Sequence, residues 1–321
     1  MRDEFPIFQK HPDLIYLDSA ATAHKPRCVI DALVKFYSED YATVHRAIYR
    51  SAIRAGEQYE ETRLTVARFL NATAEEIVFT RGTTDAINLV AQSYGRAVLK
   101  PGDEILISEM EHHSNLVPWQ MVAKQTGATL RVIPIDERGV LKWKGWITPR
   151  TKIVALAHVS NVIGTINPIA EIGKEARAVG AKLLVDGAQA VAHIQIDVQA
   201  LHCDFYAFSG HKCYGPTGVG VLYGKKELLD MMPPVQGGSD MIERVDFEDA
   251  TYQAPPLRFE AGTPIIGPVI ALKAALDFIA EHRQPDLLLP HATERLLEIP
   301  NLKIIGTAPE KGPILTFYIE G

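Results

Sequence analysis

One lysine lies where a charged side chain is costly. Residues 205–224 read FYAFSGHKCYGPTGVGVLYG: an apolar strand, a turn with Ser209, His211 and Lys212, and a glycine-rich passage into a second apolar strand. A lysine between two buried strands faces a desolvation cost unless its amine is paired, neutralised or covalently used. The turn therefore predicts a lysine with a chemical role.

Two further motifs offer partners for a ligand of that lysine. In LLVDGAQ (183–189), Asp186 ends an apolar strand, and in RGTTD (81–85), Thr83 and Thr84 open a helix whose free N–H groups could bind phosphate. Each motif alone is also typical of an ordinary helix N-cap. A lysine for an aldehyde, a carboxylate for a cationic ring nitrogen and a helix terminus for a phosphate together predict pyridoxal phosphate.

Two other motifs could be read as a metal site and as a phosphate-binding loop. EHHSN (111–115) contains neighbouring histidines, which point in different directions on a strand or a helix and lack the usual spacing of zinc ligands. A flat imidazole stacked on an aromatic ligand suits His112 better. GPTGVG lacks the GK[ST] ending of a phosphate loop and leads into a strand. We therefore expect no metal here and a structural turn at GPTGVG.

The elements that must position these residues alternate between short apolar runs and helical patterns. EEIVFT, DEILIS, TLRVIPI, TKIVALAHVS, AKLLVDGAQ and CDFYAFSG read as strands, with helical patterns between several of them. This order predicts an α/β fold with a mostly parallel sheet flanked by helices, whose ligand site lies at the carboxyl ends of the strands. Five strand ends carry polar residues: Thr83 and Thr84, His112 and His113, Asn161, Asp186, and Ser209 to Lys212.

The flanking regions suggest a division of the chain. Residues 25–41 and 54–71 read as helices outside the sheet, the first opened by Pro26. After Gly224 the pattern loosens, a helix begins near Val269, and residues 301–321 offer two apolar strands. We expect an N-terminal arm (1–15), a large cofactor-binding domain (16–255) and an incomplete small C-terminal α+β domain (256–321).

Composition limits the class of protein. The 321 residues are 47% hydrophobic and carry a net charge of −6 with scattered basic residues, which disfavours nucleic acid or an anionic membrane as partner. Neither a spanning apolar stretch nor a signal-peptide pattern occurs, so we expect a cytoplasmic protein. Cys28, Cys203 and Cys213 are isolated, which is typical of a reducing compartment.

The motifs resemble a known family over residues 14–275. YLDSAATA, VHRA, RGTTDAINLVA, EHHSNLVPWQ, HVSNVIGT, VDGAQA, DFYAFSGHKCYGPTGVGVLYG and RFEAGTP are similar to those of the SufS/CsdA group of cysteine desulfurases. This group belongs to the class-V aminotransferases, which are fold type I pyridoxal-phosphate enzymes with three layers. The resemblance implies that L-cysteine is converted to L-alanine and that its sulfur passes to an enzyme thiolate as a persulfide for iron–sulfur cluster assembly.

The same resemblance implies roles for individual residues. Lys212 would be joined to the cofactor aldehyde and act as the catalytic base, and Asp186 would hold the ring nitrogen. Gln189 would contact the ring oxygen and His112 would stack on the ring. The remaining roles are phosphate binding by Thr84, beside Thr83, with Ser209 and His211, a contribution by Thr263 across a homodimer interface, Asn161 near the substrate, and His45 and Arg46 at the active-site entrance.

The sequence departs from the family at the step that needs a thiol. The nucleophilic cysteine of the family lies in an Arg-x-Gly-x-His-Cys-like loop of the small domain, beside an arginine that binds the substrate carboxylate, and neither occurs in the 321 residues. The stretches LKWKGWITPR and EHRQPDLLLPHATERL are also shorter than the family pattern, which is compatible with natural truncation, engineering or a sequence joined across missing loops. We expect none of Cys28, Cys203 and Cys213 to act as the nucleophile.

Three functions remain open from these residues. The first is a SufS-type desulfurase that supplies sulfur for iron–sulfur clusters, with a sulfur-acceptor protein as a candidate partner. The second is a pyridoxal-phosphate enzyme that needs no thiol, such as a selenocysteine lyase acting on L-selenocysteine, an aminotransferase or a racemase. The third is a non-catalytic relative that binds the cofactor or a partner.

Overall fold

A seven-stranded sheet forms the centre of the molecule in the computed structural model, which describes residues 1–45, 48–283 and 288–320. Its strand order is β1-β7-β6-β5-β4-β2-β3. β7 pairs antiparallel with both β1 and β6, and the other pairs are parallel, so the mostly parallel sheet predicted above is confirmed. The strands are β1 (Ile77–Thr80), β2 (Glu104–Ser108), β3 (Thr129–Ile133), β4 (Thr151–Ala157), β5 (Lys182–Asp186), β6 (Phe205–Ser209) and β7 (Gly220–Gly224).

This topology brings the polar strand ends together. Since only β7 is reversed, the carboxyl ends of the other six strands meet at one edge of the sheet. Each of these strands is followed at that edge by a turn or loop, as the rule for parallel α/β sheets requires. The edge is therefore where side chains from distant parts of the sequence become neighbours.

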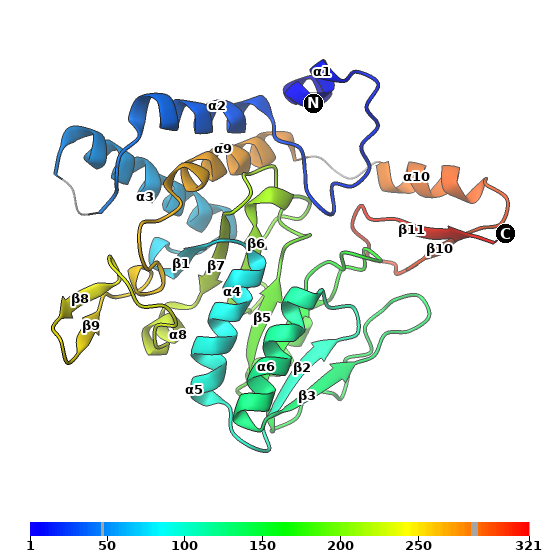
Figure 1. The fold of residues 1–321 in the computed structure, drawn as a ribbon. Helices are drawn as coiled ribbons and strands as arrows, with labels where there is room; N and C mark the ends of the chain where they lie inside the picture. The colour runs from blue at the N-terminus through cyan, green and yellow to red at the C-terminus, as the bar shows by residue number, and fades with distance from the viewer. Residues whose placement is uncertain (46–47, 284–287, 321) are drawn as a thin grey trace.

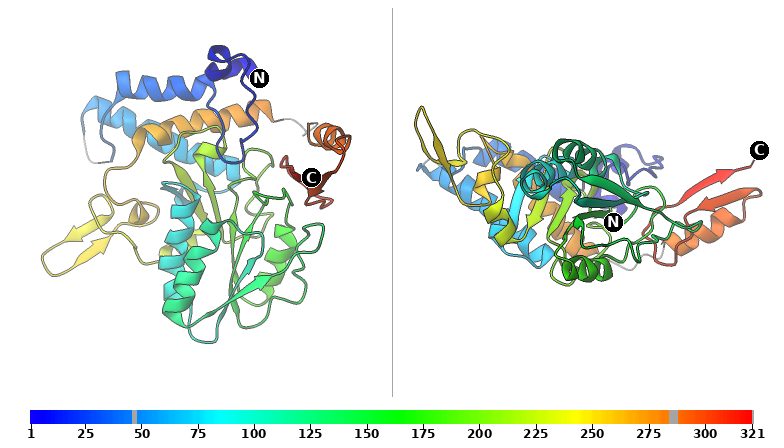
Figure 2. Two further views of the ribbon diagram at one scale, coloured as in Figure 1. Left: turned by 45° about the vertical axis from the view of Figure 1, so that its right-hand side comes forward. Right: turned by 90° about the horizontal axis from the view of Figure 1, so that it is seen from below.

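Helices cover both faces of the sheet, as Figure 1 and the view from below in Figure 2 show. α4, α6 and α8 share an apolar cluster with one face, and α3, α7 and α9 share a second cluster with the other. The molecule therefore has the three layers expected of its fold class. The bounds are α3 (Arg50–Leu70), α4 (Thr83–Val90), α5 (Arg96–Val98), α6 (Val117–Thr126), α7 (Ile169–Ala178), α8 (Lys226–Met231) and α9 (Ile266–His282).

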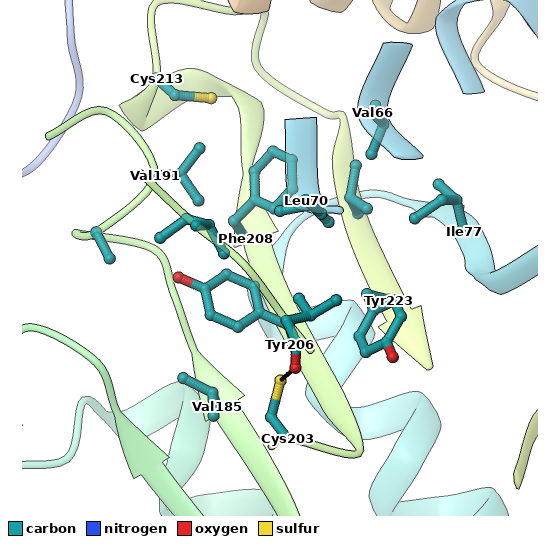
Figure 3. Close-up of a cluster of buried hydrophobic side chains, with 14 of the residues drawn as sticks. Val66, Leu70, Ile77, Val185, Val191, Cys203, Tyr206, Phe208, Cys213 and Tyr223 are labelled. Atoms are coloured by element: carbon teal, nitrogen blue, oxygen red, sulfur yellow. Dashed lines mark hydrogen bonds between the residues drawn. The ribbon is translucent and has the colours of Figure 1, made fainter. Parts of the chain in front are cut away.

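Alternation along the central strands explains why both faces need a cover. In β6, Tyr206 and Phe208 point into one cluster and Phe205 and Ala207 into the other, as the two-residue period of a strand dictates. Figure 3 shows the first cluster, in which Tyr206 and Phe208 pack with side chains of α3 and β5. Burying one such large side chain contributes about 1.5–3 kcal/mol, so this core holds the strand ends in place.

The amino-terminal helices lie outside the sheet, as predicted. α1 (Pro6–Lys10) is followed by α2 (Arg27–Lys35), which packs against α9 (Figure 1). Pro26 caps α2 rather than lying within it. The expected helix over 25–41 is therefore shorter, and its last part, Phe36–Asp40, continues as a wider π-helical turn.

The segments after β7 form smaller elements. β8 (Ile242–Val245) and β9 (Ala250–Tyr252) form a hairpin that projects from the body in both figures. α10 (Leu288–Leu297) precedes the antiparallel pair of β10 (Leu302–Ile305) and β11 (Thr316–Ile319), which are the two strands predicted near residue 321. Over the described ranges, no helix combines the length and apolarity needed to span a bilayer.

Candidate active site

A pocket of about 520 Å³ lies at the carboxyl edge of the sheet. Its lining residues come from loops after β1, β2, β4, β5 and β6 and from the N-terminal segment around Asp18. The structure thus brings to one pocket nine of the site residues predicted from the sequence. These are Thr83, Thr84, His112, Asn161, Asp186, Gln189, Ser209, His211 and Lys212.

Lys212 reaches the pocket from a short 3₁₀ turn, Gly210–Lys212, between β6 and β7. The turn needs a glycine at 210, because a Cβ there would lie 2.8 Å from a methyl group of Val219. Burial lowers the pKa of Lys212, and the nearby Asp186 only partly opposes this effect. The amine is therefore more easily neutral than an exposed lysine, which suits attack on an aldehyde or proton transfer.

Asp186 ends β5 in a buried position. Its Oδ1 accepts a hydrogen bond from Ala188 N at 2.9 Å, and within the described residues Oδ2 has no hydrogen-bond partner. Burial raises the pKa of Asp186, while the Ala188 bond and the charges of Lys212 and His112 oppose the shift. The carboxylate is thus short of partners and is suited to hold a cationic group in the pocket.

His112 has a defined hydrogen-bonding state. Its Nδ1 lies 2.9 Å from Ser114 Oγ and accepts from Ser114 N at 3.1 Å, which leaves any ring proton on Nε2 when the ring is neutral. Burial, the charge of Lys212 and His113 lower the pKa of His112, with Asp186 opposing them. A neutral, flat ring therefore faces the pocket.

The start of α4 provides the polar end of the pocket. Thr83 N donates to Ser209 Oγ at 2.8 Å, and Thr84 Oγ1 lies 2.7 Å from Ser114 Oγ. The close contact between β7 and the turn before α4 depends on a glycine, because a Cβ at Gly220 would lie 2.4 Å from the Cα of residue 82. Free N–H groups and hydroxyls at a helix N-terminus are suited to bind phosphate.

The N-terminal segment closes the pocket from the other side, and sequence reasoning assigned it no role. Gln189 Nε2 donates to Ala20 O at 2.7 Å, and the carbonyl of His211 accepts from Ala23 N at 3.0 Å and from Lys25 Nζ at 3.1 Å. The two bonds to His211 fix the Lys212 turn to Ala23 and Lys25, and the Gln189 bond fixes the loop after β5 to Ala20. The available signal was the YLDSAATA motif, which ends at Ala23.

Ser114 was also missed, although it lies within the EHHSN motif. It joins Thr84 at the start of α4 to the ring of His112. A small hydroxyl directly after two histidines gave no reason to expect such a bridge.

Three predicted site residues are not placed in this pocket. His45 packs edge-on against Tyr59, with Nε2 3.7 Å from Glu60 Oε1. Thr263 is exposed and lines a separate hollow that it shares with Tyr59. Arg46 lies outside the described residues, as do residues 284–287 of the second shortened stretch.

The cysteines lie away from the pocket lining. Cys203 and Cys213 point into the buried cluster of Figure 3, and burial raises the pKa of both thiols, that of Cys213 to about 12. Cys28 is exposed on α2, and partial burial of its thiol raises its pKa as well. None of them has the lowered pKa of a reactive thiolate.

The pocket fits pyridoxal phosphate. An under-partnered buried carboxylate, a lysine with a lowered pKa, a neutral imidazole and a helix N-terminus match the ring nitrogen, aldehyde, ring face and phosphate of that cofactor. In the part of the chain that the structure describes, no group of His, Cys, Asp and Glu side chains has the arrangement of a metal site.

The chain is similar in sequence to known proteins along most of its length. The family described as aminotransferase class-V matches residues 15–321. A cysteine desulfurase of Dickeya dadantii is 52% identical over 98% of this chain and 80% of its own length. A cysteine desulfurase of Synechococcus elongatus is 48% identical over the whole chain, which spans about half (53%) of that relative.

Solved structures of cysteine desulfurases are also similar to this chain. The cysteine desulfurase CsdA from Escherichia coli superposes with a TM-score of 0.90 at 44% identity, over 100% of this chain and 82% of that one. The apo cysteine desulfurase from Thermococcus onnurineus gives a TM-score of 0.95 at 38% identity, with the same coverage of both chains. The chain therefore belongs to the class-V aminotransferase family, whose cofactor is pyridoxal phosphate, and within it to the cysteine desulfurases.

Proposed function

We propose that this chain is a SufS-type cysteine desulfurase that releases L-alanine from L-cysteine and delivers the sulfur for iron–sulfur cluster assembly. One observation carries the proposal: Lys212, Asp186, Gln189 and His112 line a single pocket beside the start of α4. The names of the relatives, which are cysteine desulfurases, support the choice of substrate.

The roles of the side chains follow from their environment. Bound pyridoxal phosphate supplies an electron sink that weakens the bonds around the substrate α-carbon. Asp186 would hold the proton of the ring nitrogen, since its buried carboxylate has an oxygen to spare among the described residues. Lys212 Nζ, with its lowered pKa, would take the α-proton of the substrate. Neutral His112 would cover the ring without adding a competing charge.

Substrate orientation would fall to the loop after β4. Asn161 lines the pocket, and its loop is held by Ser160 N, which donates to Thr165 O at 2.9 Å. Lys311 donates to the carbonyl of Ile163, so the C-terminal segment also supports this loop. From this position Asn161 would donate to a substrate carboxylate or to the ring oxygen.

The sulfur step requires an acceptor thiolate. In a balanced transfer, a thiol and L-cysteine give a persulfide and L-alanine: the thiolate forms an S–S bond, the C–S bond breaks, and the electron pair left on the substrate takes up a proton. We propose that the thiolate is not Cys28, Cys203 or Cys213, because all three have raised pKa values. An added or partner thiol would then accept the sulfur.

The test combines spectroscopy with product analysis. Protein loaded with pyridoxal phosphate should show a visible band that changes on addition of L-cysteine, and alanine should form when an external thiol is supplied. Lys212→Ala should alter the band and abolish alanine formation. Lys226→Ala, which removes a surface lysine paired with Asp230, is the matched control. A wild-type protein that binds the cofactor but ignores amino acids would leave the non-catalytic relative as the better description.

A second candidate is chemistry that needs no protein thiol. It is favoured by the same observation that none of the three cysteines lines the pocket. L-Selenocysteine lysis, transamination or racemisation would then proceed as well without an added thiol as with one. Comparing L-cysteine, L-selenocysteine and L-alanine with and without external thiol separates this candidate from the first.

Assembly, domain division and location stay predictions. We propose a homodimer in which Thr263 reaches the partner's phosphate site, His45 and Arg46 lie near an entrance, and a separate protein accepts the sulfur. The division into an arm (1–15), a large domain (16–255) and the beginning of a small domain (256–321) is likewise proposed, as is a cytoplasmic location. Sedimentation of the cofactor-loaded protein tests the dimer.

A further inference from the structure

Glu111 is a half-buried acid next to the pocket that the proposed function does not use. Its Oε1 accepts from Ser108 Oγ at 2.5 Å and from Ala157 N at 3.1 Å, and its Oε2 accepts from Asn115 Nδ2 at 2.6 Å. Ser108 ends β2, Ala157 ends β4, and Asn115 precedes α6. One carboxyl group therefore joins two strand ends and the start of a helix.

These contacts place Glu111 between the two groups that flank the proposed ring site. His112 is the next residue in the chain. Ala157, which donates to Glu111, is the direct partner of Asp186 in the pairing of β4 with β5. The segment that carries His112 is thus tied by one side chain to the backbone beside Asp186.

A second hydrogen bond holds the Asn115 side chain in one orientation. Asn115 Oδ1 accepts from Trp119 Nε1 at 3.0 Å, and both side chains are fully buried. The amide of Asn115 is therefore fixed with its NH₂ group toward Glu111. Two of the three partners of the carboxyl, Asn115 Nδ2 and Ala157 N, can only donate.

The third partner allows the carboxyl to be neutral. The Ser108 hydroxyl can donate to an ionised Glu111 or accept the proton of a neutral one. No described Lys, Arg or His forms an ion pair with Glu111. The titratable groups on the surrounding elements are His112 and His113 on its own segment, His158 after β4, Asp186 on β5 and Lys212 in the turn after β6.

The electrostatic surroundings bring the titration of Glu111 close to neutral pH. Burial and the charge of Asp186 raise the pKa of Glu111 to about 7, against the lowering effect of its three hydrogen bonds. Burial raises the pKa of Asp186 as well, and the charges of Lys212 and His112 oppose that shift. The two neighbouring carboxyls thus differ in the charged groups around them, and a negative charge on one disfavours ionisation of the other.

We propose that Glu111 is a positioning residue that holds His112 and Asp186 in register across the pocket and whose protonation state is coupled to that of Asp186. The proposal rests on the proposed roles of His112 and Asp186 toward the cofactor. A neutral Glu111 leaves Asp186 as the single anion on that side of the pocket. Its ionisation adds a like charge that disfavours ionised Asp186.

The protonation state is tested on the cofactor-free protein, where activity plays no part. Infrared spectra recorded between pH 5 and 9 should show a protonated-carboxyl band that disappears with a midpoint near 7 in the wild type and is absent in Glu111→Gln. Glu109→Gln is the matched control, because Glu109 is exposed on the same segment and its side chain accepts, among the residues that the structure describes, only from Ile135 N. A wild-type spectrum identical to that of Glu111→Gln would overturn the proposal.

A second variant guards against a Glu111→Gln protein that does not fold. Ser108→Ala removes the hydroxyl that lowers the pKa of Glu111, so the infrared midpoint should move to higher pH. An unchanged midpoint would show that the band belongs to another acid and would equally overturn the proposal.

The positioning role is tested on protein that has been loaded with pyridoxal phosphate. The visible band of bound pyridoxal phosphate should titrate with a midpoint shifted by about 0.5 pH unit or more in Glu111→Gln, whereas Glu109→Gln should match the wild type. Identical titrations in all three proteins would refute the coupling to Asp186. Loss of the band in Lys212→Ala tests the cofactor site separately, so failure of the proposed function and failure of this inference give different results.

Discussion

Two buried clusters of charged side chains differ in how completely their charges are paired. In the first, Arg63 and Glu260 form a two-point ion pair with distances of 2.8 and 3.0 Å, and Glu260 also accepts from Tyr59 Oη and Phe79 N. In the second, the pocket, half-buried Lys212 and buried Asp186 form no ion pair of this kind with each other.

This difference distinguishes charges that stabilise the fold from charges that are available for chemistry. A buried charge that is fully paired is committed to the fold, and removing one partner leaves the other uncompensated. A buried charge with few partners has a shifted pKa and remains available to a ligand. By this criterion the Arg63 cluster joins α3 to the segment before α9, and the pocket is the place where a cofactor completes the set of partners.

The largest expected effect is on the paired cluster. Arg63→Met should lower the free energy of unfolding by about 3–5 kcal/mol, because it leaves the Glu260 carboxylate buried without its cation. Denaturant unfolding monitored by circular dichroism measures the change. The double variant Arg63→Met, Glu260→Gln should recover much of the loss. A double variant as unstable as the single one would contradict the pairing explanation.

Asp186→Asn should act in the opposite direction on stability. Removing a poorly paired buried charge should raise the free energy of unfolding of the cofactor-free protein by about 1 kcal/mol. L-Cysteine turnover by the loaded protein should nevertheless fall on the order of 10²-fold, since the ring nitrogen loses its carboxylate. If this variant were as unstable as Arg63→Met, the distinction between the two clusters would not hold.

The buried His158 tests the comparison through the pH dependence of the free energy of unfolding. Burial lowers the pKa of His158 to about 4, and Nδ1 lies 3.1 Å from Tyr206 Oη below the pocket. The unfolded chain therefore binds more protons than the folded one between pH 6.5 and 4, so stability is lost as pH falls through this range. At pH 5 the loss should be about 2 kcal/mol relative to pH 8.

Unfolding of His158→Gln as a function of pH measures that contribution. The difference between the variant and the wild type should shrink as pH falls from 8 to 5. Exposed His291→Gln serves as the control and should follow the wild type. Parallel curves for His158→Gln and the wild type would mean that His158 is not kept neutral in the fold.

The smallest effect is expected at exposed pairs. Lys226 lies 2.7 Å from Asp230 one helical turn away, and both side chains are about half exposed. Lys226→Ala should change the free energy of unfolding by less than about 0.5 kcal/mol, and added salt should reduce the effect further. A loss near that of Arg63→Met would mean that pairing alone, and not burial, sets the strength of such contacts.

Much of the architecture could be predicted from the sequence. The strands around IVFT, EILIS and FYAFS follow from apolar runs bounded by turn residues, and their alternation with helices indicated the parallel sheet. The residues that follow these strands line the pocket because parallel strands end at the same edge. The ion pair of Arg63 with Glu260 could not be predicted, because 197 residues separate its members and neither the predicted helix with Arg63 nor the RFEAGTP motif with Glu260 indicates the other as its partner.

The sequence by itself determined the family, the type of sheet and the residues that gather near Lys212. Those properties depend on local patterns and on the direction of the strands. Only the tertiary structure decided which acids are paired and which are not. Glu111 and Asp186 each look like a carboxylate beside an apolar strand, and their protonation depends on burial and on partners that the fold brings from other strands.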